Sequence, residues 1–316
     1  MTSTYAPTAI DLSRLPAPDA IEILSTTAMQ QGFVDRFLEE WAAQRVIDPL
    51  LPAFEEQTLQ TNPAIVVGRA WTYLRTLDRQ RVNDGLRALL ASLSTGSNLD
   101  ALAAARNIAR LTIVPEIGDE PAVLESDAAL LRRYLLSFDV PSAGSAGRYL
   151  FDAWAAWPQS DDRTLGLWDA RINGRAIHGR LGDTDVVLIG PFGRSPTSLE
   201  LATVRAAVTD VNRAPEAVAI SVLAADRLEY VVSLVLDVPG VGPSAEAIRL
   251  EAETRVRAAA TERIIIGGEI PDGLLAGAAY GPGVIKVRDL APVVIDPDPY
   301  KVPVMTSINI VTTVRE

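Results

Sequence analysis

Few residues of this 316-residue chain are of types that support catalysis. His178 is the single histidine and cysteine is absent, which excludes thiolate chemistry, cysteine-ligated metals and histidine-rich metal sites. A serine–histidine–aspartate triad would have to use His178, but the sequence contains no Gly-x-Ser-x-Gly elbow. We therefore expect His178 to be a partly exposed structural residue, and we predict no catalytic, cofactor-binding or metal-binding residue.

Two further patterns could bind ligands, and both fall short of their motifs. Gly240-Val241-Gly242 lies between a predicted strand and a predicted helix, but Ala245 stands where a dinucleotide-binding turn needs its third glycine. Asp161-Asp162 and Asp296-Pro297-Asp298 lack the spacing of a calcium-binding loop. We predict a strand-to-helix turn and two solvated loops.

Carboxylates and aromatic residues leave one enzymatic alternative open. The 40 aspartate and glutamate residues could supply a facing pair for hydrolysis in a cleft of the 150–190 region. An aromatic patch in the same region could stack on bases or sugars, but without interleaved basic residues a local core or a protein interface is favoured. The patch consists of Tyr149, Phe151, Trp154, Trp157 and Trp168.

Charge and hydropathy argue against two classes of partner. The formal net charge of −11 disfavours binding to nucleic acid and to anionic lipid, because both need clustered Lys and Arg. No apolar run approaches the roughly 18 residues of a transmembrane helix, and residues 1–11 lack the basic start and apolar stretch of a secretory signal. We expect a protein that contacts neither nucleic acid nor membrane.

The predicted elements divide the chain into five parts. Residues 1–20 indicate an extended arm, and residues 21–140 a helical bundle region. Residues 141–183 combine a small-residue joint with the aromatic patch and a predicted Asn-Gly hairpin. Residues 184–290 indicate an α+β domain, and residues 291–316 a C-terminal extension with a closing strand. Within the helical part, one side of the helix predicted at 64–78 contains Val67, Trp71, Leu74 and Leu77.

The part from 184 to 290 has the most regular pattern. Thr197 and Glu200 have the spacing of a capping box, and Val232, Leu234 and Leu236 lie on or beside one face of a strand with period two. The order of elements is that of a ferredoxin-like β-α-β-β-α-β sandwich. We therefore predict an α+β multidomain chain in which a helical N-terminal region precedes a β hairpin segment and this sandwich. The six elements are a strand at 185–189, a helix at 197–213, strands at 218–222 and 230–238, a helix at 244–263 and a strand at 283–287.

Several motifs resemble those of the baseplate J-like proteins, which are wedge components in the tails of contractile phages. Residues 79–83, Arg-Gln-Arg-Val-Asn, are similar to the family's Arg-x-Arg-x-Asn helix. Residues 96–102 are similar to its Gly-x-Asp-Leu-Asp-x-Leu turn, with Asn98 in place of the first aspartate. Residues 10–18 resemble its N-terminal arm, and residues 141–149 its small-residue turn before an aromatic. The resemblance singles out Arg79, Arg81, Asn83, Gly96, Leu99 and Asp100.

The resemblance implies a structural role without catalysis. Similar proteins build each baseplate wedge as two copies with one copy of a second wedge protein, and adjacent wedges join into a ring around the central hub and spike. The sheath initiator and the tail-fibre connector dock on the same ring, which relays the trigger for sheath contraction. The implied location is the tail baseplate of the virion, after assembly in the cytoplasm of the bacterial host. A wedge component of a non-phage contractile injection particle is the alternative.

Two conformations of one chain within a wedge would require a hinge. Residues 141–147, Pro-Ser-Ala-Gly-Ser-Ala-Gly, are the candidate, and we predict that Gly144 and Gly147 permit the movement. The resemblance weakens at 155–183, where the aromatic loop is longer than the strands usual in the family.

Overall fold

The computed structural model describes residues 18–54 and 61–315, which form two compact units. Among these residues, one unit extends to Leu102 and the other begins at Ala103. The predicted arm at 1–20 lies almost wholly outside the described residues. The chain is mixed α and β with a helical N-terminal region, as predicted, while the division into five parts stays a prediction.

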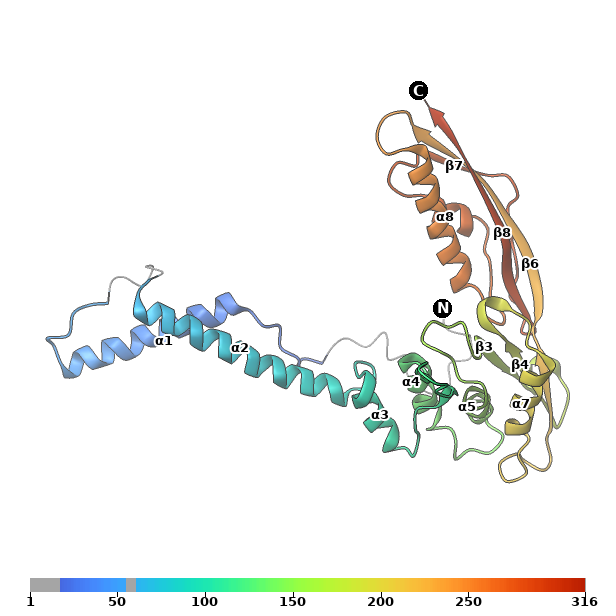
Figure 1. The fold of residues 1–316 in the computed structure, drawn as a ribbon, viewed down its shortest axis with the longest axis horizontal. Helices are drawn as coiled ribbons and strands as arrows, with labels where there is room; N and C mark the ends of the chain where they lie inside the picture. Colours follow the sequence, from blue (N-terminus) through green and yellow to red (C-terminus); the bar gives the residue numbers. More distant parts are fainter. Residues whose placement is uncertain (1–17, 55–60, 316) are drawn as a thin grey trace. The chain divides into compact units, whose positions relative to one another are not determined.

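The first unit consists mainly of two long helices, α1 (Thr26–Ile47) and α2 (Pro63–Leu89), which pack side by side (Figure 1). Ser25 begins α1 because its side chain accepts a hydrogen bond from the Ala28 amide. Asn62 caps α2 in the same way by accepting from the Ala64 amide. Pro63 occupies the first turn, where a backbone amide would have no partner within the helix, so the missing N–H of proline costs no hydrogen bond. The short helix α3 (Gly96–Ala104) follows.

The second unit begins with a short antiparallel pair and two helices. Strands β1 (Thr112–Val114) and β2 (Val123–Leu124) pair with each other, and α4 (Asp127–Leu136) and α5 (Ala146–Ala156) follow. Ser126 is the N-cap of α4, because its side chain accepts a hydrogen bond from the Ala129 amide.

A three-stranded sheet continues this unit in the order β3-β4-β5. Strand β4 pairs antiparallel with β3 and parallel with β5, and helix α7 makes the crossover between β4 and β5. Helices α5 and α7 pack on the sheet around a core that includes Trp154, Leu188 and Val204. The bounds are β3 (Asp169–Asn173), α6 (Arg175–His178), β4 (Asp183–Ile189), the 3₁₀ helix η2 (Pro191–Gly193), α7 (Ser198–Val208) and β5 (Ala219–Ala224).

The hairpin predicted at Asn173-Gly174 is partly wrong. Strands β3 and β4 do pair antiparallel, with Asn173 opposite Asp185. They are joined by residues 174–182, which include α6, and not by a two-residue turn. Gly174 is extended, with φ of −106°, whereas a tight hairpin turn needs a positive φ.

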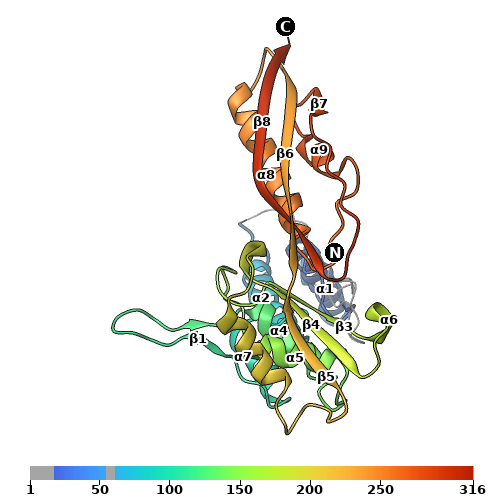
Figure 2. The same ribbon diagram turned by 90° about the vertical axis from the view of Figure 1, so that its right-hand side faces the viewer.

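A second three-stranded sheet has the order β7-β6-β8. Strand β6 (Asp226–Pro239) pairs antiparallel with β7 (Lys286–Asp289) and parallel with β8 (Lys301–Arg315). Figure 2 shows helices α8 (Ala245–Glu262) and α9 (Leu274–Ala279) on one face of this sheet. The core between them includes Leu234, Ile248 and Val256.

The ferredoxin-like arrangement is not confirmed, because its strands are divided between the two sheets. Only Ala225 separates β5 from β6, so the chain runs on from one sheet into the other. The Ala225 amide donates to the Leu188 carbonyl on β4, and the Asp226 amide donates to the carbonyl of Tyr300, the residue before β8. No glycine or proline interrupts residues 219–238, and the extended backbone therefore continues without a reversal.

Contacts between the two sheets hold the second unit together. The Trp168 indole donates to the Ile264 carbonyl at 2.7 Å, and the Ile266 amide donates to the Asp169 carboxylate at 2.8 Å. An apolar cluster that includes Val187 and Val302 surrounds these bonds. In the part of the chain that the structure describes, no helix is both long and apolar enough to cross a membrane.

Candidate interaction site on the helical unit

The family-motif residues Arg79 and Asn83 anchor the segment that precedes α1. The Asn83 side chain accepts a hydrogen bond from the Glu22 amide at 3.0 Å and donates one to the Glu22 carbonyl at 2.9 Å. Arg79 donates to the Glu22 carboxylate at 2.7 Å from the preceding turn of α2. Asn83 is buried, so this two-way bond satisfies an amide that would otherwise be costly to bury. Arg81 is exposed.

Small and polar residues of α2 lie at its contact with α1. The Phe33 ring of α1 lies on Gly68, where an added Cβ would come within 2.5 Å of it. The Thr72 hydroxyl donates to Gln30 on α1 at 3.1 Å. A glycine and a threonine at this contact allow the helices to approach closely without a large apolar core. Accordingly α1, all of whose residues are described, has no fully buried residue.

Most of the large apolar side chains of α2 are exposed to solvent, although the Trp71 ring also lies 5.6 Å from the Phe33 ring of α1. Val67 and Leu74 are each 61% exposed, and they belong to the side predicted from the sequence as apolar. Contiguous exposed apolar side chains on a helix mark a surface for another protein. We call this set the exposed α2 face: Val66, Val67, Trp71, Tyr73, Leu74, Leu77, Val82 and Leu89.

The second part of the family motif lies at the start of α3. Gly96 has φ of +55°, a conformation that favours glycine, and it is the first residue of α3. Leu99 is 1% exposed and is the largest of the buried apolar residues of this helix. Gly96 and Asp100 both take part in further polar contacts.

Comparison with known proteins gives two matches to this chain. Residues 60–116 match the baseplate J-like N-terminal domain. Baseplate protein J of Escherichia phage P2 is 29% identical over 302 residues, which cover 90% of each chain. The chain is therefore similar to the baseplate J-like family at residues 60–116 and to a phage baseplate protein over most of its length. The resemblance seen in the sequence is therefore confirmed.

The baseplate J-like domain match covers α2, α3 and β1. It therefore includes the whole exposed α2 face and the motif residues from Arg79 to Asp100. Sequence reasoning missed Glu22, the partner of Arg79 and Asn83, because a lone glutamate before a helix gives no signal of its own. It also missed the Phe33–Gly68 contact, because a glycine inside a helical pattern does not show which ring lies against it.

His178 and Asp162, two polar residues with possible catalytic or metal-binding chemistry, form hydrogen bonds within the fold. His178 Nε2 lies 3.1 Å from the Asn173 carbonyl, and Nδ1 accepts from the Arg180 amide at 3.1 Å. Asp162 accepts from the Ser160 and Thr164 hydroxyls, and these bonds hold the pKa of its carboxyl below the ordinary value. Within residues 18–54 and 61–315 no three metal-ligating side chains gather.

The aromatic patch is largely core, as favoured from the sequence. Tyr149, Trp154 and Trp168 are each at most 5% exposed. The guanidinium of Arg132 lies 4.0 Å from the centre of the Trp154 ring and that of Arg163 lies 3.9 Å from the Trp168 ring. The arginines therefore cover ring faces that a base or sugar would need.

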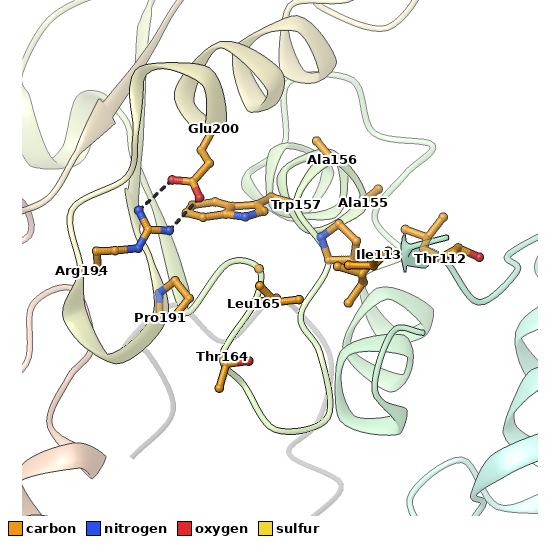
Figure 3. Close-up of a pocket in the computed structure, with 14 residues that line it drawn as sticks. Thr112, Ile113, Ala155, Ala156, Trp157, Thr164, Leu165, Pro191, Arg194 and Glu200 are labelled. Atoms are coloured by element: carbon orange, nitrogen blue, oxygen red, sulfur yellow. Dashed lines mark hydrogen bonds and ion pairs between the residues drawn. The ribbon is translucent and has the colours of Figure 1, made fainter. Parts of the chain in front are cut away.

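A hollow of about 470 Å³ lies beside Trp157, between β1, the 158–166 loop and the start of α7 (Figure 3). Arg194 donates to Glu200 at 2.7 and 3.0 Å across it. Burial would raise the pKa of Glu200, but the bonds from Arg194 and Thr197 hold that pKa below the ordinary value. Glu200 is the one acid among the lining residues, so this hollow lacks the pair of carboxylates that a hydrolase needs.

The candidate hinge at 141–147 is closely packed. Gly144 has φ of +77°, and a Cβ there would lie 3.0 Å from the Pro215 ring. Gly147 lies inside α5, where a Cβ would collide with the Asp139 carboxylate. Any movement here would have to open these contacts, and the hinge stays a prediction.

Proposed function

We propose that this baseplate J-like protein is a structural wedge component of a contractile phage tail and has no enzymatic activity. The exposed α2 face carries the proposal. It lies within the domain that matches the family, and it presents a long apolar surface for another protein. The phage relative, named baseplate protein J, supports the baseplate as the location, and it favours a phage over a non-phage contractile particle.

In this proposal two copies of the chain associate with one copy of a second wedge protein. The wedges join into a ring around the central hub and spike, and the sheath initiator and tail-fibre connector dock on that ring. A bend at Gly144 and Gly147 lets the two copies differ and relays the trigger for sheath contraction. Assembly takes place in the host cytoplasm before the ring enters the virion tail.

The support from α2 is energetic. Burying one large apolar side chain stabilises a complex by roughly 1.5–3 kcal/mol before the costs of association. The exposed α2 face offers several such side chains on adjacent turns, among them Trp71, Leu74 and Leu77. Trp71 also contacts the Phe33 ring of α1, but all three side chains are more than 40% exposed, so a partner can cover them without unfolding the helix pair.

The test is co-expression of the full chain with the neighbouring baseplate gene products, followed by native mass spectrometry. We expect a heteromer with wild type and its loss with Leu74→Asp plus Leu77→Asp. Because both side chains are already exposed, the double variant should fold. Val241→Asp, at a loop side chain that is 90% exposed, is the matched control and should leave the heteromer intact. A wild-type chain that remains a monomer with every baseplate partner would overturn the wedge assignment.

A further inference from the structure

The two edges of the β7-β6-β8 sheet differ in length and charge. Strand β7 has four residues, Lys286 to Asp289, and three of them are charged. Short, charged edges prevent another strand from adding to a sheet. Strand β8 has 15 residues, and among the described elements it pairs with β6 alone. One edge is therefore protected, and the other presents a row of free backbone groups.

The open part of β8 begins after its first five residues. The Gly267 amide donates to the Lys301 carbonyl at 2.8 Å, so the loop before α9 covers the start of the strand. Beyond the bulge at Tyr230/Val231, where β6 and β8 shift register, residues 306–314 extend to the end of the sheet (Figure 2). They are Thr-Ser-Ile-Asn-Ile-Val-Thr-Thr-Val, with no charged residue and no proline. A neutral, β-branched edge of this length invites strand addition.

We propose that β8 pairs antiparallel with β8 of a second copy of this chain, about a two-fold axis at Ile310. This inference rests on the self-association in the proposed function and assigns it a surface. A two-fold contact buries both open edges at once. Pairing of β8 with β7 of another copy would cover four residues and leave most of β8 open.

The pattern of burial along β8 fits this axis. Ile310 is buried against α8 and Ile308 packs on the same core, whereas Asn309 and Val311 face the open side of the sheet. Ile310 is the middle residue of 306–314. Pairing about it sets Asn309 opposite Val311 of the second copy, open side to open side, and Ile308 opposite Thr312. A shift by one residue would turn the core face of one copy toward solvent.

Charge also favours a second copy over an acidic or basic partner. The open edge is neutral although the whole chain carries a net charge of −11. Two copies meeting here therefore bring no like charges together along the paired strands. The β7-β6-β8 sheets of the two copies would then form one continuous sheet, with α8 and α9 of both copies on the same side.

The experiment uses charge exchange at the paired positions of the full chain. One variant carries Asn309→Lys and Val311→Lys, and the other carries Asn309→Glu and Val311→Glu. Both residues are exposed, so each variant should fold. Each alone sets like charges opposite one another twice in the dimer, and we expect its dimerisation to weaken about tenfold or more by sedimentation equilibrium. An equimolar mixture should regain a dimer that contains one copy of each.

Controls separate this surface from the exposed α2 face. All chains also carry Leu74→Asp and Leu77→Asp, which remove α2 from the measurement. Val231→Lys lies on the same side of the sheet but on the central strand, and it should leave dimerisation unchanged. We call the chain that carries only Leu74→Asp and Leu77→Asp the parent chain. Its amides at residues 306–314 should exchange hydrogen more slowly as its concentration rises. A parent that stays monomeric, or variants that dimerise as the parent does, would overturn the β8 pairing. The proposed function is tested independently, by whether the wild-type chain, with Leu74 and Leu77 intact, forms the heteromer with a wedge partner.

Discussion

Asn83 exchanges two hydrogen bonds with the backbone of Glu22, a residue 61 positions earlier in the chain. One buried side chain thus connects the segment before α1 to the C-terminal part of α2. The family motif is therefore part of the support for the exposed α2 face, because it fixes where α1 lies against the helix that presents this face.

Replacing Asn83 by alanine should destabilise the helical unit by about 1–3 kcal/mol. The Glu22 amide and carbonyl would lose their partner, and alanine offers neither a donor nor an acceptor. Arg81→Ala is the matched control from the same motif, and it should cost under about 0.5 kcal/mol because Arg81 is exposed. Urea unfolding of the full chain, followed by circular dichroism, measures both changes. Equal midpoints would show that the Asn83–Glu22 bonds contribute nothing.

Two glycines of α2 should respond in opposite directions to alanine. An added Cβ at Gly68 would lie 2.5 Å from the Phe33 ring, whereas at Gly85 nothing lies within 4 Å. Gly68→Ala should therefore destabilise the helix pair by about 1–3 kcal/mol through overpacking. Gly85→Ala should stabilise α2 by about 0.4–1 kcal/mol, because alanine loses less backbone entropy in a helix. Thermal unfolding of the two variants gives the signs, and stabilisation by both would contradict the close Phe33 contact.

Local signals in the sequence predicted the elements well. The capping box of Thr197 and Glu200 forms as expected. The alternation from Tyr230 to Val238 gives five buried residues on one face of β6. Each of these signals depends on neighbours within a few residues, where helix and strand periods determine which side chains share a face.

Non-local pairing could not be predicted in the same way. Nothing in residues 219–238 states whether two adjacent strands turn back on each other or continue into separate sheets. That choice depends on Leu188 and Tyr300, which accept hydrogen bonds from Ala225 and Asp226. The apolar side of α2 was recognised, but its exposure was not, because periodicity shows that a face is apolar and does not show what covers it.

The alternation on β6 can be tested by neighbouring substitutions. Leu234 is 1% exposed in the core beneath α8, and Ser233 lies half-buried on the opposite face. Leu234→Ala should cost about 2–5 kcal/mol from lost transfer energy and the cavity left behind. Ser233→Ala should cost under about 1 kcal/mol. The full chain is the right material, since β8 pairs along the whole of β6. Similar urea midpoints for the two variants would place the wrong face of β6 in the core.

The contact between the two sheets of the second unit should depend on pH through Asp169. Its carboxylate accepts the Ile266 amide at 2.8 Å. Burial raises the pKa of Asp169 from 3.8 to about 6, although the same amide and the charges of Arg132 and Arg171 act to lower that pKa. Between these two pH values the folded chain keeps the proton while the unfolded chain loses it. Stability from the neutral carboxyl is therefore complete below pH 3.8 and is lost as the pH rises through about 6.

Asp169→Asn should remove this dependence and keep the bond, since the amide oxygen can still accept from Ile266. The variant should gain stability relative to wild type as the pH rises from about 4 to about 7, by at most about 3 kcal/mol for a shift of about two pKa units. Urea unfolding at a series of pH values measures the difference. Asp161→Asn, at an exposed position eight residues earlier, should leave the pH dependence unchanged. A difference between Asp169→Asn and wild type that is flat across this range would mean that Arg132 and Arg171 keep the carboxylate ionised and that its burial costs the fold nothing.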